Sequence, residues 1–254
     1  MVGRQFVPDS NNMQRFFFDD EQIIDATFSV SGEKYNHITR SLRMNVGEYA
    51  VFCDGFGVDY ECELVSINSH SCEFKVVKSY ENVTEPNVKI TIYQCLPKGD
   101  KLDDMVKRTV QFGVYKIVPV LSSRCVSRPD SKSFDKKVER LNKISKSSSM
   151  QSMRGVVPEV CDLIDFNTAI LQMKNFDSAF LCYESENRNL IDSSLIKGKE
   201  IAFLVGPEGG ITKQEADFAS ENGILPISLG KRILRTEDAS AFLIPIVLSI
   251  TNNL

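Results

Sequence analysis

The sequence predicts an α/β protein made of a small β-rich domain followed by a larger domain with a mostly parallel sheet. From residue 88 onward, apolar runs typical of buried strands alternate with amphipathic helical segments, and this alternation favours a parallel sheet. Before residue 81, short runs of β character are separated by turn signals such as Asp54-Gly55 and Asn68-Ser69, which is typical of a small β-barrel. The segment 81–87 between them is polar and contains a proline, so we interpret it as a linker.

These patterns divide the chain into a β-rich domain over 13–80, a linker over 81–87 and an α/β domain over 88–254. Residues 1–12 are expected to be an extension or tag-like segment, because Met13-Gln14-Arg15-Phe16-Phe17 resembles a natural beginning.

In the β-rich domain we expect one helical segment over 32–44 and strands over 27–30, 48–53, 60–67 and 71–77. In the α/β domain the apolar runs predict strands over 88–96, 114–121, 156–161, 179–183, 201–205 and 224–229. The helical periodicity predicts helices over 100–112, 134–149, 167–173 and 213–222, and a last helix that begins near Thr236.

Composition and cysteine usage exclude several classes of protein. The 254 residues are 42% apolar and 25% charged, an ordinary soluble globular balance. No apolar run reaches the roughly 18 residues that a membrane span needs, and the first residues lack the apolar core of a secretory signal. The seven cysteines form no CxxC pair and the two histidines are far apart. We therefore expect a cytoplasmic protein with no metal site and no membrane partner.

The most informative stretch is 201–211, IAFLVGPEGGI, in which five apolar residues lead directly into a glycine-rich loop. Thr212 and Glu215 then form a capping-box pattern, which predicts strand, tight loop and helix in that order. Ligands of open α/β sheets bind at such carboxyl ends of strands. The loop lacks the spacing of both G-x-G-x-x-G and the nucleotide P-loop. A Gly-Gly loop alone is more often a simple turn, so a second feature is needed to predict a site.

The loop after the next strand, 229–237, supplies that second feature. Two β→α loops of one parallel sheet open on the same edge, so we expect both loops to face one pocket. Ile233 and Leu234 are apolar where a loop would ordinarily be polar, and they would suit the face of a flat ring such as adenine. Arg232 and Arg235 add positive charge. Glu237 either stabilises the start of the last helix or has a catalytic role.

A basic stretch between residues 124 and 154 is the third candidate. It holds nine basic residues against three acidic ones, a local charge of +6 in a chain whose net charge is −4. Such a patch binds phosphates or is simply a solvated helix face.

Four segments in this order, NHITRSLRMNVGE, CLPKGDKLDDMV, LVGPEGGIT and SLGKRILRTEDA, resemble the bacterial small-subunit rRNA methyltransferase E family, a group of SPOUT methyltransferases. The resemblance runs from Met13 to the C-terminus. It implies a SPOUT α/β domain with a deep trefoil knot in the last third of the chain, preceded by a PUA-like β-barrel. It also implies S-adenosylmethionine (SAM) as cofactor, a homodimer, and methyl transfer to N3 of a uridine in 16S rRNA.

The resemblance also assigns residues. Two arginines, Arg154 and Arg235, would stabilise the deprotonated uracil ring, and Glu237, Glu208 or water would take its proton. The two loops would bind the cofactor through Leu204, Val205, Gly206, Pro207, Glu208, Gly209, Gly210, Leu229, Gly230, Arg232, Ile233, Leu234, Arg235 and Thr236. Together with the basic stretch, it predicts RNA contacts by Arg15, Arg40, Arg43, Lys98, Lys101, Arg124, Lys136, Lys137, Lys143 and Gln151.

The sequence departs from the family pattern at Met150, Gln111 and Lys231. Met150 replaces a glutamate near the expected substrate. Two alternatives therefore stay open: an rRNA-binding assembly factor with weakened catalysis, and a SPOUT methyltransferase that acts on another RNA.

Overall fold

The computed structural model describes residues 13–184 and 190–254, so the expected extension over 1–12 lies outside the described residues. The chain forms two compact units. Of the described residues, the N-terminal unit comprises those up to Glu85 together with Met153–Val156, and the C-terminal unit comprises those of Pro86–Ser152 and Val157–Leu254. The short segment Met153–Val156 thus belongs with the first unit, although the sequence places it inside the second domain.

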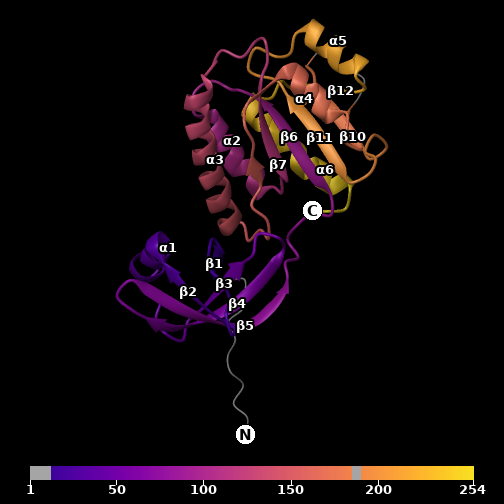
Figure 1. The fold of residues 1–254 in the computed structure, drawn as a ribbon. Coiled ribbons are helices and arrows are strands. Elements are labelled where there is room, and N and C mark those ends of the chain that lie inside the picture. Colours follow the sequence, from indigo (N-terminus) through magenta and orange to yellow (C-terminus); the bar gives the residue numbers. More distant parts are fainter. Residues whose placement is uncertain (1–12, 185–189) are drawn as a thin grey trace. The chain divides into compact units, whose positions relative to one another are not determined.

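The N-terminal unit is built on a five-stranded sheet with the strand order β1-β3-β4-β5-β2 (Figure 1). Strand β1 pairs parallel with β3 and the other neighbours are antiparallel. Three phenylalanines, Phe28, Phe52 and Phe74, pack together at the centre of its core. The strands are β1 Gln14–Phe17, β2 Thr27–Ser31, β3 Tyr49–Cys53, β4 Val58–Ile67 and β5 Ser71–Glu81. The sequence analysis missed β1 and predicted the other four.

The helical segment of this unit is shorter than expected. A short helix, α1 Gly32–Asn36, continues as a π-helical turn over His37–Ser41. Ile38 is fully buried and anchors the turn in the core. The backbone of Arg43 is left-handed, with φ 55°, and this conformation ends the helical path before Met44.

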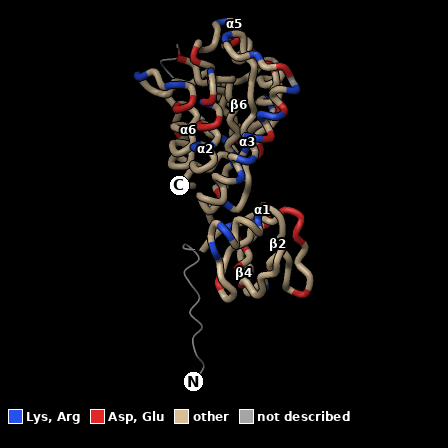
Figure 2. The backbone as a smooth tube through the Cα atoms, turned by 90° about the vertical axis from the view of Figure 1, so that its left-hand side faces the viewer, with Lys and Arg blue, Asp and Glu red and all other residues tan. Residues whose placement is uncertain are grey.

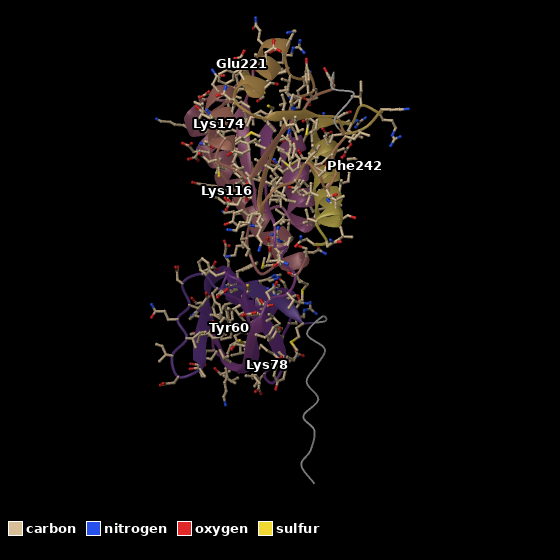
Figure 3. All side chains as sticks on the ribbon, turned by 90° about the vertical axis from the view of Figure 1, so that its right-hand side faces the viewer. Tyr60, Lys78, Lys116, Lys174, Glu221 and Phe242 are labelled. Carbon is tan, nitrogen blue, oxygen red and sulfur yellow. The ribbon has the colours of Figure 1, made fainter. Side chains whose placement is uncertain are left out.

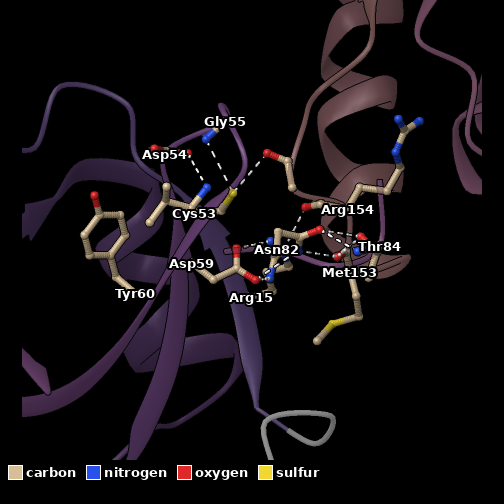
Figure 4. Close-up of polar contacts among 12 residues, drawn as sticks. Arg15, Cys53, Asp54, Gly55, Asp59, Tyr60, Asn82, Thr84, Met153 and Arg154 are labelled. Atoms are coloured by element: carbon tan, nitrogen blue, oxygen red, sulfur yellow. Dashed lines mark hydrogen bonds and ion pairs between the residues drawn. The ribbon is translucent and has the colours of Figure 1, made fainter. Parts of the chain in front are cut away.

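A buried ion pair joins distant parts of the N-terminal unit (Figure 4). The Arg15 guanidinium donates to both carboxylate oxygens of Asp59, at 2.9 and 2.5 Å, and also donates to the carbonyl of Arg154 at 3.0 Å. Asn82 donates to Asp59 at 2.9 Å and to the Met153 carbonyl at 3.3 Å. These bonds attach residues 153–156 to the β-sheet.

The C-terminal unit contains a seven-stranded sheet in which every pairing of the described strands is parallel, as the sequence predicts. The strand order is β12-β10-β11-β6-β7-β8, and β9 also pairs with β7 (Figure 1). The strands are β6 Lys89–Cys95, β7 Lys116–Leu121, β8 Glu159–Val160, β9 Ile164–Asp165, β10 Ser178–Cys182, β11 Glu200–Val205 and β12 Leu225–Ile227.

Within the part of this unit that the structure describes, five helices alternate with these strands, which confirms the predicted α/β pattern. They are α2 Lys101–Gln111, α3 Ser131–Gln151, α4 Phe166–Met173, α5 Lys213–Glu221 and α6 Thr236–Ile250. Helix α2 packs against both α3 and α6. The central strands are buried on both faces, and Phe180 of β10 stacks on Phe203 of β11 with 5.1 Å between ring centroids. Apolar side chains fill the space between sheet and helices (Figure 3).

Candidate functional site

A cavity of about 680 Å³ lies at the carboxyl ends of β10, β11 and β12 in the C-terminal unit. Because these strands are parallel, the loops that follow them open at one edge of the sheet. The lining residues are Cys182–Glu184 after β10, Val205–Glu208 with Gly210 and Ile211 after β11, Ser228–Thr236 after β12, Lys101 of α2 and Ala239 of α6.

The glycine loop has the predicted geometry. Thr212 caps α5 and forms the complete capping box with Glu215, so the turn into the helix is fixed. Gly210 has φ +69°, which glycine adopts without strain. A Cβ on Gly206 would lie 3.0 Å from Cγ1 of Ile211, and the Gly209 carbonyl accepts a hydrogen bond from Arg124 at 2.8 Å. The loop therefore presents backbone to the cavity.

The second loop supplies apolar and positively charged side chains. Leu229 and Leu234 are half-buried and pack on the core, whereas Ile233 is 88% exposed. Arg232 and Arg235 line the cavity and are exposed. Neither guanidinium has a hydrogen-bond or ion-pair partner within 13–184 and 190–254. Arg235 is the residue that immediately precedes α6.

Two carboxylates share one lysine beside the glycine loop. Lys101 Nζ lies 2.8 Å from Glu208 Oε1 and 3.5 Å from Glu237 Oε1. Burial acts to raise the pKa of Glu208, but hydrogen bonds from Lys101 and backbone N–H groups outweigh it and leave that pKa below its usual value. The hydrogen bond to Glu208 in turn raises the pKa of Lys101. At neutral pH this pair is therefore an ionised carboxylate and an ammonium.

The three expected catalytic residues lie in different places. Arg235 is on the cavity wall. Glu237 is 8% exposed in the first turn of α6 and is not on the wall, and its Oε2 has no hydrogen-bond partner among the described residues. Arg154 belongs to the N-terminal unit, where its buried guanidinium pairs with Glu85 at 2.6 Å. Arg154 is not among the residues that line the cavity, and its charge is neutralised by a glutamate of its own unit.

The residues expected to contact RNA also lie in different places. Arg15 is 7% exposed and bonded to Asp59, so the structure places it inside the N-terminal unit and not on a surface. Gln151 accepts a hydrogen bond from Gln111 at 3.1 Å, and Lys101 lies on the cavity. The exposed members are Arg40 and Arg43 in the N-terminal unit, and Lys98, Arg124, Lys136 and Lys143 in the C-terminal unit, with Lys137 half-exposed. Figure 2 shows Lys and Arg positions along α3.

Sequence reasoning located most of the cavity wall but missed one side of it. All the expected cofactor-binding residues line the cavity except Leu204, which is a core side chain, and Gly209, which faces Arg124. The wall that was missed comprises Cys182, Tyr183 and Glu184, because β10 lies between β11 and β12 in the sheet. A short apolar strand gives no signal of its place in the sheet order. Four further residues line the cavity but were not among the assigned cofactor contacts: Ile211, Ser228, Lys231 and Ala239.

The residues present fit a nucleoside-containing cofactor such as SAM. The cavity volume lies within the roughly 300–1,000 Å³ of small-molecule sites. Backbone at Gly206 and Gly210 and half-buried leucines face the same space as charged side chains. Among the described residues, no cluster of three or more His, Cys, Asp or Glu side chains is placed to hold a metal ion. None of the helices described is both long and apolar enough to cross a membrane.

Comparisons with known proteins agree with this geometry. Residues 84–248 match the family described as an RNA methyltransferase domain, and residues 30–77 match an RNA methyltransferase PUA domain. Ribosomal RNA small subunit methyltransferase E of Bacillus subtilis is 35% identical over 240 residues, which cover 91% of this chain and 94% of that protein. The same-named protein of Synechocystis is 28% identical and is covered over 72% of its length, with 86% of this chain aligned.

Solved structures are also similar. The Neisseria gonorrhoeae ribosomal RNA small subunit methyltransferase E bound to S-adenosyl methionine is 30% identical, with a TM-score of 0.82, over 93% of this chain and 97% of that one. A Legionella pneumophila methyltransferase in complex with SAM, at 22% identity and a TM-score of 0.84 over 93% and 97% of the two chains, shares the fold. Because the match spans both units and includes the loops around the cavity, the chain belongs to the ribosomal RNA small subunit methyltransferase E family of RNA methyltransferases.

Proposed function

We propose that this protein transfers the methyl group of SAM to N3 of a uridine in the 16S rRNA of the small ribosomal subunit. One observation supports the assignment above all. The two loops that carry the family resemblance line one cavity, and an arginine without a partner among the described residues, Arg235, lies on its wall.

SAM supplies a methyl group that is already activated by its sulfonium, so the protein needs no nucleophile of its own. The chemical difficulty lies in the acceptor, because N3 of uracil carries a proton and is a poor nucleophile until that proton leaves. A cation beside the ring oxygens stabilises the negative charge that develops there. We assign this role to Arg235.

The proton passes to water in this proposal, because the nearby carboxylates are poorly suited to take it. Glu208 is held ionised by Lys101 and has a lowered pKa, which makes it a weak base. Glu237 lies off the cavity wall with Oε1 turned to Lys101. Its carboxylate stabilises the positively polarised first turn of α6.

RNA binding is assigned to the basic face of α3 and to exposed arginines of the PUA unit, Arg40 and Arg43. Of the three α3 lysines expected to contact RNA, Lys136 and Lys143 are exposed and Lys137 is half-exposed. These side chains have no ion-pair partner among the described residues, so their charge is available to phosphate groups.

Reversing three charges tests that surface. The triple variant Lys136→Glu, Lys137→Glu, Lys143→Glu should weaken rRNA binding by about 10-fold or more at low salt, and should flatten the salt dependence by roughly one unit of slope per lost phosphate contact. Binding is measured by filter retention across a salt series.

The matched control reverses three exposed lysines of the same unit away from α3: Lys174, Lys199 and Lys213. Lys174 lies on the surface at the end of α4 (Figure 3). An equal loss of binding in the control would show that only net charge matters and that α3 is a solvated face.

We further propose the finer features that the family resemblance implies. These are a trefoil knot in the last third of the chain, closure of the N-terminal sheet into a PUA-like barrel, domain limits of 13–80 and 88–254 with 81–87 as linker, a cytoplasmic homodimer, and cofactor contacts by the two loops. Light scattering on the purified protein tests the dimer, since a monomeric mass at micromolar concentration contradicts it.

Transfer of labelled methyl groups from SAM to purified RNA tests the assigned substrate. We expect label in 16S rRNA or small-subunit particles and none in tRNA. Label in tRNA would instead support the alternative that this enzyme modifies another RNA. Tight rRNA binding without any transfer would support the assembly-factor alternative suggested by Met150 and Gln111.

A further inference from the structure

The amide side chain of Gln94 is a polar group inside an apolar strand. Gln94 is near the carboxyl end of β6, between Tyr93 and Cys95, and is fully buried. Burying an amide without hydrogen bonds costs several kcal/mol, and apolar residues fill most of the neighbouring positions of this strand. We therefore expect the buried Gln94 amide to be held by hydrogen bonds to its neighbours.

Each polar atom of this amide has a partner. Nε2 donates to the backbone carbonyl of Cys95 at 2.9 Å and to the Thr236 hydroxyl at 2.8 Å. Oε1 accepts from the hydroxyl of Ser240, which is fully buried. Thr236 and Ser240 are four residues apart in α6 and therefore lie on the same face of that helix. The Gln94 amide thus forms hydrogen bonds to that face at the first turns of α6.

The orientation of this arrangement is fixed by donor and acceptor chemistry. A backbone carbonyl only accepts, so the NH₂ group of Gln94 must be the end that faces Cys95 and Thr236. The Thr236 hydroxyl accepts from Gln94 and has a single proton to donate. That proton goes to the carbonyl of Gly206, at 2.5 Å.

The chain of bonds ends in the cavity wall. Gly206 is the first residue of the glycine loop, and Thr236 closes the second loop, 30 residues further along the sequence. Both residues line the cavity, whereas Gln94 does not. The bond from Thr236 to Gly206 therefore joins the bases of the two loops, and Gln94 determines in which direction the Thr236 hydroxyl points.

We propose that Gln94 is a positioning residue of the methyltransferase site, which holds the two cofactor loops at a fixed separation through Thr236 and Gly206. The proposal rests on the proposed use of this cavity for SAM. Its expected consequence is preorganisation: loops already fixed before binding lose less conformational freedom when the cofactor enters.

Two nearly isosteric variants test the proposal. Gln94→Met removes the amide, and Thr236→Val removes the hydroxyl that links it to Gly206. Each should raise the Kd for SAM, measured by calorimetry, by about 10-fold. The KM for SAM should rise in parallel while the KM for RNA stays within twofold. The double variant should raise the Kd for SAM little more than either single variant does, because both substitutions interrupt the same chain of hydrogen bonds.

Thr109→Val is the matched control. Thr109 is fully buried in α2, and its hydroxyl bonds residues of that same helix, namely Met105 and Val106. This variant should lower the melting temperature without changing the Kd for SAM. If Gln94→Met and Thr236→Val behave in the same way, with lower melting temperatures and an unchanged Kd for SAM, Gln94 is only a packing residue and the proposal is overturned.

The outcomes separate this proposal from the proposed function. Wild-type protein that binds no SAM contradicts the function itself, whereas wild-type binding with unaffected variants contradicts only the role of Gln94. If Gln94→Met does not fold, Thr236→Val decides alone, because an unchanged Kd in that variant breaks the proposed link between the loops.

Discussion

Replacing Arg235 by alanine should slow methyl transfer by roughly 10²- to 10³-fold at saturating SAM and RNA, a loss typical of removing one preorganised charge stabiliser. The guanidinium lines the cavity and has no partner among the described residues. Its removal therefore breaks no hydrogen bond or ion pair with a described residue, and the melting temperature should stay unchanged. Single-turnover transfer of labelled methyl groups measures the chemical step directly.

Two comparisons make this result specific to Arg235. Arg235→Lys keeps the charge but loses the planar fork of donors, and it should recover part of the rate. Lys174→Ala removes an exposed cation of the same unit at the end of α4, away from the cavity, and should transfer methyl groups at the wild-type rate. A full rate in Arg235→Ala would mean that the deprotonated ring is stabilised by another group.

Replacing Asp59 by alanine should destabilise the N-terminal unit by about 3–5 kcal/mol, because it leaves a buried arginine without its counter-charge. The Arg15 side chain is 2% exposed. Burial acts to lower the pKa of Arg15, but the hydrogen bond and charge of Asp59 outweigh it, so Arg15 stays protonated and must keep a partner. Denaturant unfolding, monitored with a spectroscopic probe in the N-terminal unit, measures the loss of unfolding free energy.

The exposed ion pair Lys213–Asp217 is the control for this prediction, since its side chains are 84% and 57% exposed. Asp217→Ala should lower the free energy of unfolding by less than about 1 kcal/mol. The double variant Arg15→Met, Asp59→Leu should recover much of the stability, because neither charge is then buried. A loss below about 1 kcal/mol in Asp59→Ala would show that water reaches Arg15 in solution.

The parts of this protein that follow a local rule could be predicted from the sequence. Strand β11, the glycine loop and α5 follow from five apolar residues, three glycines and the Thr212–Glu215 capping box. The parallel sheet follows from the alternation of strands and helices. In each of these cases the physical cause lies within a few residues.

The parts that depend on distant residues could not be predicted. Arg15 and Arg154 have the same sequence appearance as surface arginines, but Asp59 and Glu85, which are 44 and 69 residues away, neutralise them inside the fold. The β10 wall of the cavity depends on sheet order, and the π-helical turn after α1 is anchored by Ile38 in a core built from distant strands. Gln94 carried no sequence signal, because its side-chain partners, Thr236 and Ser240, are more than 140 residues further along the chain.

The most direct test of the assigned reaction is nucleoside mass spectrometry of 16S rRNA from cells that lack this protein. We expect loss of a single N3-methyluridine, its return when the wild-type chain is restored, and no return with Arg235→Ala. An unchanged content of N3-methyluridine in 16S rRNA after deletion would contradict the account.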